Sequence, residues 1–462
     1  MKTYDIVVIG SGGGMKIALP AASMGLKTAF IEQSAVGGTC LNRGCIPSKM
    51  LIYPTQLPGL IREAHRINIT SDSNARVEVA ALVKRISETV DRMSANQQSK
   101  IEHTPNLDFY GVHAEFISDR VLRAGEDELT AEKVFIATGA RPQIPDIPGL
   151  ADTPFMTSRE ALRRTDLPDS LLVIGAGYIA VELGGAYAAV GTSVEFIVRS
   201  RFLRQEDSEV AEAFSHVFGR AHSVHTGVVP MRVDYDSGSF SVTCKDTSGQ
   251  QRVFTGDALL VATGVMPCTD DLGLQDTGIK TDQNGFVRVD NRLRTDVEGV
   301  YALGDCVGNY LFRHTVNYEG DYLVRTVLQG GADEPIDYGP VPHAVFSAPE
   351  IAGVGMTEQQ AFEQHKHYVV GKASYADSNA GLARGYRHGF VKVLVERSTR
   401  RILGAHILGD EASDMIHLFI AMMKKEGTLD DLLDMIFIHP ALPEIARDAA
   451  RDAKSQFDGM AP

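Results

Sequence analysis

The chain of 462 residues contains no tryptophan and only five cysteines. So few cysteines, in an odd number, exclude a disulfide scaffold, and isolated thiols suit a reducing cytoplasm. No apolar stretch approaches the ~18 residues of a membrane span; the longest, residues 171–181, ends at Glu182. The net charge of −14 lacks the positive excess that nucleic acid or an anionic membrane attracts. We therefore expect neither as a partner.

The N-terminal residues, MKTYDIVVIGSGGG, hold one lysine and a short apolar run that enters a glycine turn. They lack the longer apolar region and the cleavage site of a signal peptide, so we expect a cytoplasmic protein. With 44% apolar and 23% charged residues, the composition is that of an ordinary globular protein. The length predicts more than one domain, roughly two to four.

Two of the cysteines, Cys40 and Cys45, are close together in residues 37–49, GGTCLNRGCIPSK. In a regular helix their Cα atoms would lie roughly 8–9 Å apart, beyond the about 4.4–6.8 Å of a disulfide. If they pair, the helix must therefore be broken, and Gly44 and Pro47 both favour a break. A structural disulfide or half of a zinc site is the alternative. Zinc needs further ligands nearby, but the other cysteines are scattered singly, so we expect no metal: Cys244, Cys268 and Cys306.

A dinucleotide-binding unit is predicted at the N-terminus. Residues 4–10 form a buried strand that ends in a turn with Gly10 and Gly12, and a second strand, residues 28–31, ends at Glu32. The backbone N–H groups of such a turn bind a pyrophosphate, and the acid binds ribose hydroxyls.

Two residues depart from the usual G-x-G-x-x-G pattern of this unit. Met15 occupies the third glycine position, although Gly13 and Gly14 precede it. Pro20 lies inside the expected helix and should kink it, because proline cannot donate the helical hydrogen bond.

A second unit of the same kind starts at residue 171. The strand 171–175 leads into the turn Gly175-Ala176-Gly177-Tyr178-Ile179-Ala180, and a second strand spans residues 194–198. The chain also contains two similar buried strands that end in Ala-Thr-Gly, at residues 134–139 and 260–264. Two units in one chain predict two dinucleotides, one bound flavin and one exchanging nicotinamide.

The residues after the second strand of this second unit predict which nicotinamide binds. Arg199, Arg201 and Arg204 follow that strand, where an NAD-binding protein presents an acid to the ribose. Guanidinium groups suit the 2′-phosphate of NADPH. Glu195 is the acidic alternative but lies in mid-strand, and a solvated basic run is the other interpretation. We expect NADPH, with NADH possible.

The segment GGTCLNRGCIPSK resembles the active-site signature of class I flavin disulfide reductases, the family of dihydrolipoamide dehydrogenase, glutathione reductase, mycothione reductase and mercuric reductase. The resemblance continues through residues 299–305, 346–358 and 401–409, and so covers essentially the whole chain. It implies an α/β fold with two Rossmann-like dinucleotide-binding domains and an α+β C-terminal dimerisation domain. It also implies bound FAD and a homodimer.

We place a linker at Pro142, Pro145 and Pro148, and predict four segments. Residues 1–148 are the first part of the FAD domain and residues 149–265 the nicotinamide domain. Residues 266–335 complete the FAD domain, and residues 336–462 form the dimerisation domain. A long amphipathic helix is expected at residues 78–103, with five buried positions: Ala81, Val83, Ile86, Val90 and Met93.

The resemblance also assigns catalytic roles. Cys45 would be the thiolate nearest the flavin, and Cys40 the thiol that attacks the substrate. Lys49 and Glu182 would form an ion pair beside the flavin, and Tyr178 would gate the nicotinamide pocket. The other expected FAD contacts are Gly10, Gly12, Gly14, Glu32, Gly38, Thr39, Lys49, Ala114, Thr138, Gly139, Gly304 and Asp305. The expected nicotinamide contacts are Gly175, Gly177, Tyr178, Ile179, Arg199, Arg201, Arg204 and Gly264.

The segment His439-Pro440-Ala441-Leu442-Pro443-Glu444 carries a candidate catalytic base. Pro440 keeps His439 out of a helix, and Pro443 suits the first turn of the helix that carries Glu444. The resemblance implies a His–Glu dyad that reaches into the partner subunit's active site, although a lone histidine is usually structural.

These features predict a reductase that passes hydride from NADPH through FAD and the cysteines to a small-molecule disulfide. The phrases IHPALPE and VRSRFLR resemble mycothione reductase most closely. Dihydrolipoamide dehydrogenase is the alternative, and a non-catalytic flavoprotein subunit of a multienzyme complex is an alternative of another class. Mercuric reductase and large thioredoxin reductase need C-terminal cysteine or selenocysteine, and no cysteine follows Cys306.

Overall fold

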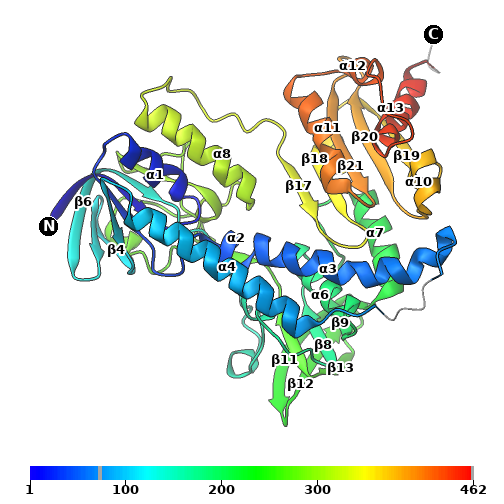
Figure 1. Cartoon of the computed structure of the whole chain (residues 1–462), viewed down its shortest axis with the longest axis horizontal. Helices are drawn as coiled ribbons and strands as arrows, with labels where there is room; N and C mark the ends of the chain where they lie inside the picture. The colour runs from blue at the N-terminus through cyan, green and yellow to red at the C-terminus, as the bar shows by residue number, and fades with distance from the viewer. Residues whose placement is uncertain (71–74, 459–462) are drawn as a thin grey trace.

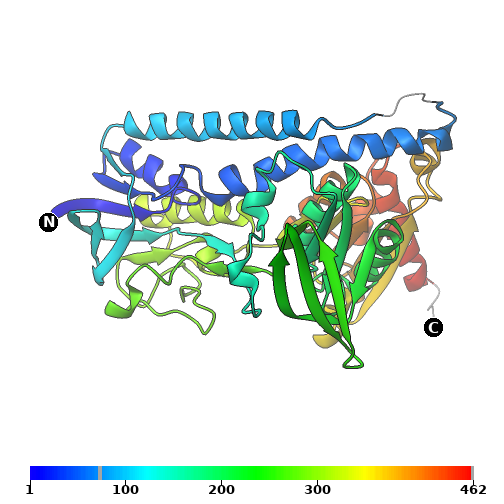
Figure 2. The same cartoon turned by 90° about the horizontal axis from the view of Figure 1, so that it is seen from below.

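The computed structural model describes residues 1–70 and 75–458 of the chain. Three regions are visible, each built on its own sheets, and two long helices run along one side of the molecule (Figures 1 and 2). The α/β architecture with two nucleotide-binding units and a separate C-terminal region confirms the predicted fold class. None of the helices in the described part is long and apolar enough to cross a membrane.

The first region contains a parallel sheet with the order β3-β2-β1-β6 and β16 beside β6. Its central strands are largely buried, because helices pack on one face of the sheet and the antiparallel strands with residues 272–307 pack on the other. β4 and β5 continue the sheet from β6 as an antiparallel extension. The strands are β1 (Lys2–Ile9), β2 (Thr28–Ile31), β3 (Leu107–Tyr110), β4 (Ala114–Ser118), β5 (Val121–Ala124), β6 (Asp127–Ile136) and β16 (Val300–Ala302).

The helices of the first region are α1 (Met15–Ser23), α2 (Gly38–Arg43), α3 (Cys45–Glu63), α4 (Val79–Glu102) and α8 (Arg313–Leu323). α1 runs through Pro20 and ends at Ser23, so the proline leaves residues 15–23 in one helix. Short 3₁₀ turns lie at η1 (Ala64–Ile67), η3 (Leu274–Asp276) and η4 (Gly304–Cys306), and η5 (Val324–Leu328) is a π-helical turn.

The long helix expected at residues 78–103 is α4, but two of its predicted core positions are wrong. Ala81 is exposed and Met93 is only half-buried. The buried stripe instead consists of Leu82, Val83, Ile86, Val90, Ser94 and Ile101. Its spacing of three and four residues is that of one helix face, and Ala81 lies outside this face.

The second region repeats the parallel arrangement in a smaller sheet of order β10-β9-β8-β14. A three-stranded antiparallel sheet, β11-β12-β13, packs beside it, and β7 pairs with β15 where the chain leaves and re-enters the first region. The strands are β7 (Ala140–Pro142), β8 (Ser170–Ile174), β9 (Ser193–Val198), β10 (Ser223–Thr226), β11 (Val228–Asp236), β12 (Ser239–Asp246), β13 (Gln251–Gly256), β14 (Ala258–Val261) and β15 (Val265–Pro267). The helices are α5 (Ser158–Ala161), α6 (Tyr178–Ala189) and α7 (Ser208–Ala221), after the 3₁₀ turn η2 (Leu150–Asp152).

The third region is an antiparallel sheet of order β17-β18-β21-β20-β19 with helices against it. The strands are β17 (Pro342–Val345), β18 (Ile351–Gly355), β19 (Tyr368–Ser374), β20 (Phe390–Glu396) and β21 (Ile402–Leu408). The helices are α9 (Glu358–Glu363), α10 (Asn379–Arg384), α11 (Ala412–Lys424), α12 (Leu429–Leu433) and α13 (Pro443–Asp458).

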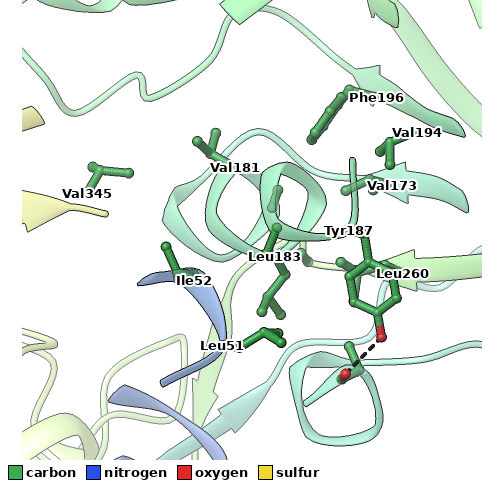
Figure 3. Close-up of a cluster of buried hydrophobic side chains, with 14 of the residues drawn as sticks. Leu51, Ile52, Val173, Val181, Leu183, Tyr187, Val194, Phe196, Leu260 and Val345 are labelled. Atoms are coloured by element: carbon green, nitrogen blue, oxygen red, sulfur yellow. Dashed lines mark hydrogen bonds between the residues drawn. The ribbon is translucent and has the colours of Figure 1, made fainter. Parts of the chain in front are cut away.

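One hydrophobic core joins all three regions. Leu51 and Ile52 of α3 lie beside Leu183 of α6, and Val345 of β17 lies on the far side of Ile52 (Figure 3). Each of these side chains is at most 5% exposed. The helix that starts at Cys45 is therefore fixed against both the second and the third region.

Candidate active site

The chain breaks its helix between the two cysteines. α2 ends at Arg43 and α3 begins at Cys45, and Gly44 between them has φ −142° and ψ −115°, far from helical values. A Cβ on Gly44 would lie 3.0 Å from the carbonyl oxygen of Thr39. The expected interruption is therefore present, and it brings the thiols of Cys40 and Cys45 within hydrogen-bonding reach.

The two thiols have unlike acidities. The hydrogen bond with Cys45, reinforced by burial, raises the pKa of Cys40 well above its usual value. The same hydrogen bond, donated by Cys40, lowers the pKa of Cys45 to about 7, with further help from Lys49. Cys45 is also the first residue of α3, where the helix N-terminus stabilises an anion. One proton shared by the pair thus leaves the negative charge on Cys45.

Lys49 lies one turn further along α3 and forms an ion pair with Glu182 of α6. The Lys49 Nζ to Glu182 Oε2 distance is 2.8 Å, and the Glu182 side chain is only 9% exposed. The other carboxylate oxygen accepts the backbone N–H of Phe346 at 3.0 Å, and Lys49 Nζ lies 4.5 Å from the centre of the Phe346 ring. The family resemblance implied the ion pair but not the contacts of Phe346, which follows β17.

The first glycine turn packs tightly around backbone. A Cβ on Gly10 would lie 2.3 Å from the Ala137 carbonyl oxygen, and one on Gly38 would lie 2.6 Å from Gly12 Cα. A Cβ on Gly14 would lie 2.1 Å from the Gly10 oxygen, so Gly14 allows the close helix approach expected of the third glycine, and Met15 does not disturb it.

Glu32 directly follows β2 and has a fixed carboxylate. Ser11 donates its backbone N–H and its hydroxyl to Glu32 Oε2 at 2.9 and 2.7 Å. The Ser34 N–H donates to Oε1 at 2.7 Å. The acid is thus held at the end of the strand beside the turn, as ribose recognition requires.

Three polar groups near this turn lack protein partners among residues 1–70 and 75–458. Thr138 Oγ1 is buried without a hydrogen bond. Asp305 accepts none either, and burial raises its pKa to about 6 against the opposing charge of Arg313. Gln97 Oε1 of α4 is also buried and unpaired, next to Gly37. Gln97 and Arg313 carry no sequence motif and were not predicted.

The remaining residues expected to contact FAD have the following places. Thr39 lies in the first turn of α2, and Ala114 is the buried first residue of β4. Gly139 follows β6 with φ 70°, and nothing lies within 4 Å of the position of its missing Cβ. The Gly304 N–H donates to Glu319 Oε2 at 2.6 Å.

The second glycine turn is more open. A Cβ on Gly175 would lie 2.2 Å from the Ala262 carbonyl oxygen, whereas no atom lies within 4 Å of the Cβ position of Gly177. Tyr178 and Ile179 start α6, with the free N–H groups of its first turn. Gly264 has φ 131° and faces Gln143.

Three exposed arginines follow β9, which ends at Val198. Arg199 and Arg204 have no side-chain partner in the described part of the chain, and Arg201 reaches Ser208 Oγ only at 3.4 Å. Glu195 lies within the strand, as its register with Leu172 requires, and pairs with His225 Nε2 at 2.8 Å.

His439 and Glu444 are brought together at the start of α13. The His439 Nδ1 to Glu444 Oε2 distance is 3.0 Å, and Glu444 also bonds the Ala441 N–H and Arg447. The Ala441 N–H, then His439 and Arg447, hold the pKa of Glu444 below its usual value. The His439 side chain is 63% exposed, and its neighbours Ile436 and Ile438 are 99% and 81% exposed.

Family models match nearly the whole chain. The pyridine nucleotide-disulphide oxidoreductase model matches residues 4–320, and the dimerisation domain of the same family matches residues 341–450. The chain belongs to this family. It is therefore a flavin-dependent pyridine nucleotide-disulfide oxidoreductase, which uses FAD and a nicotinamide nucleotide, and its dimerisation domain supports a homodimer.

Several members of the family are similar along their length. Mycothione reductase of Mycobacterium tuberculosis is 35% identical over 97% of this chain and 99% of that protein. Mercuric reductase of Staphylococcus aureus is 34% identical over 93% of this chain and 79% of that protein. Dihydrolipoyl dehydrogenase of Rhizobium etli is 31% identical over 98% of both. The solved structure of the flavoprotein disulfide reductase RclA from Escherichia coli has a TM-score of 0.86 at 30% identity, over 98% of this chain and 99% of that one.

Proposed function

We propose that the enzyme uses NADPH to reduce a small-molecule disulfide, as a mycothione-type reductase would. The observation that carries this proposal is the cysteine pair across the helix break, in which Cys45 is acidified and Cys40 holds the proton. Bound FAD supplies the hydride chemistry that links the nicotinamide to this pair. The Glu32 carboxylate, Thr138 Oγ1 and Asp305 are oriented or unpaired groups that fit a dinucleotide at the first turn.

The chain's own residues then carry the thiol chemistry. In the reduced pair, Cys40 gives its proton to His439 and attacks one sulfur of the substrate disulfide, and a mixed disulfide forms. The leaving sulfur takes the proton from His439 and departs as a thiol. Cys45 then attacks the Cys40 sulfur, which re-forms the Cys40–Cys45 disulfide and expels the second sulfur as a thiolate, and this thiolate takes a proton from water. Two electrons from the nicotinamide and two protons thus convert one disulfide into two thiols.

Glu444 orients His439 in this scheme and favours its charged form, because a carboxylate stabilises an imidazolium. We propose that His439 serves the site of the partner subunit. Its side chain and those of Ile436 and Ile438 extend into solvent in the single chain, an exposure that a second copy would cover.

We further propose NADPH as the preferred nucleotide. Arg199 and Arg204 are exposed cations without protein partners in the described residues, and Glu195, the acid that would bind an NAD ribose, is paired with His225. We also propose the roles of the site residues named above, the division of the chain into four segments, and a cytoplasmic location.

The deciding experiment is a kinetic screen of oxidised mycothiol, glutathione and lipoamide with NADPH and with NADH. We expect turnover of a low-molecular-weight disulfide with NADPH. The alternative, dihydrolipoyl dehydrogenase, is favoured by a relative of equal length, and predicts oxidation of dihydrolipoamide with NAD⁺ instead. A preparation that binds no FAD and oxidises neither nucleotide would rule out both.

A further inference from the structure

A second buried polar cluster lies between the nucleotide-binding region and the C-terminal sheet, beside the ion pair of Lys49. Its centre is Glu206, which precedes α7 and is 0% exposed. The Tyr178 hydroxyl donates to Glu206 Oε1 at 2.6 Å, and His343 Nε2 donates to Oε2 at 2.8 Å. Each carboxylate oxygen therefore has one partner, and the two partners come from different regions.

The carboxylate of Glu206 is charged. Burial raises its pKa, but the hydrogen bonds from His343 and Tyr178 outweigh this effect and hold the pKa below its usual value. A charged acceptor makes a shorter and stronger hydrogen bond than a neutral one. The tyrosine hydroxyl is thus held by a strong bond at the first residue of α6.

The Tyr178 ring is held as well as its hydroxyl. It lies nearly parallel to the ring of Phe312, with centroids 6.5 Å apart and planes at 14°. It is also nearly parallel to the His343 ring, with centroids 6.4 Å apart and planes at 11°. His343 therefore contacts Tyr178 directly and also through the shared carboxylate.

The position of His343 depends on a glycine in the neighbouring strand. Gly353 of β18 lies opposite His343 of β17 and His406 of β21 in the strand register. A Cβ on Gly353 would lie 2.7 Å from His343 Cε1 and 2.9 Å from His406 Nδ1. The missing side chain thus makes room for both imidazoles.

We propose that Glu206 and His343 form a latch that holds Tyr178 at the nicotinamide site, so that nucleotide binding must break the Tyr178–Glu206 bond. This inference rests on the proposed function, which places Tyr178 at that site. If most molecules are latched, the apparent affinity for the nucleotide falls by the fraction that is open. Glu206 and His343 are then positioning residues, which set nucleotide affinity from the C-terminal region without touching the nicotinamide.

The test is equilibrium binding of NADP⁺, and separately of NAD⁺, to the FAD-loaded dimer by calorimetry. Tyr178→Phe removes the hydroxyl and keeps the ring, so we expect its Kd to be roughly three- to tenfold lower than that of the unmodified protein. Tyr187→Phe is the matched control, because Tyr187 is on the same helix and bonds the Ala161 carbonyl oxygen instead.

A second variant tests the part of His343. His343→Gln weakens the support of the carboxylate, so it should also lower Kd. Combined with Tyr178→Phe, His343→Gln should lower Kd little further, because both substitutions open the same latch. An unchanged or raised Kd in Tyr178→Phe would overturn the latch while nucleotide oxidation by the unmodified enzyme still supported the proposed function. If the unmodified holoenzyme neither bound nor oxidised either nucleotide, the proposed function would fail as well.

Discussion

The two glycine turns have the same backbone pattern but different surroundings. At the first turn, Gly38 packs against Gly12, and three hydrogen bonds fix the acid at the end of the second strand. At the second turn, no atom lies within 4 Å of the Cβ position of Gly177, and three arginines at the end of the strand are exposed. An enclosed turn suits a resident cofactor, and an open one suits a nucleotide that must leave in each cycle.

The largest effect should come from the thiol that follows the enclosed turn. Cys40→Ser should abolish disulfide reduction, because the thiol nucleophile is lost. Hydride uptake from the nicotinamide should persist, since that half-reaction depends on the other turn. The measurement is disulfide turnover beside single-turnover flavin reduction. Cys268→Ser is the control, and normal turnover by Cys40→Ser would refute the assignment.

The enclosed site also needs a base. α13, which carries Glu444, lies far from α2 in both overall views (Figures 1 and 2). His439→Ala should lower kcat for disulfide reduction by roughly 10²–10⁴-fold, the usual contribution of a general base. Mixed with Cys40→Ser subunits, it should regain activity through heterodimers. His388→Ala, in the same region, should act like the unmodified enzyme, and a failure of mixing to restore activity would argue against a shared site.

At the open turn, the expected effect is smaller and specific to one nucleotide. Arg199→Ala should reduce the kcat/KM preference for NADPH over NADH by about tenfold. One charge-assisted hydrogen bond contributes about 1.5–3 kcal/mol, and a tenfold loss corresponds to the lower end of this range. The loss should appear in KM for NADPH and shrink with added salt. Arg220→Ala, another exposed arginine of this region, is the control. Equal use of both nucleotides by the unmodified enzyme would favour the dihydrolipoyl dehydrogenase alternative.

The smallest effect concerns the acidity of the thiol beside the enclosed turn. In the reduced protein, one thiol should titrate near pH 7, because the pKa of Cys45 is lowered to about 7. Lys49→Met removes a positive charge that stabilises the thiolate, so the midpoint should rise by about one pH unit. Less thiolate would then be present at neutral pH. Thiolate ultraviolet absorbance across a pH series measures this midpoint, and Lys84→Met of the exposed α4 face should leave it unchanged.

Local patterns explain what the sequence predicted. The strands, the helix break at Gly44 and the Glu444 contact to His439 arise from residues close together in the chain, where spacing decides geometry. The latch joins Tyr178, Glu206 and His343, which meet only because β17 packs beside α6. The spacing of residues along the sequence cannot predict a contact between segments that lie so far apart in the chain. The core of α4 was predicted with the right period, but Ala81 was placed on the wrong face.

The core shared by Leu51 and Ile52 of α3, Leu183 of α6 and Val345 of β17 (Figure 3) has a consequence for how the molecule unfolds. A segment that shares its packing with two others cannot melt alone, because it would expose their apolar faces to water. The three regions should therefore give one cooperative calorimetric transition. Neither the nucleotide-binding region nor the C-terminal region should be obtainable as a stable fragment, and the cysteine helix should resist proteolysis until the whole subunit opens.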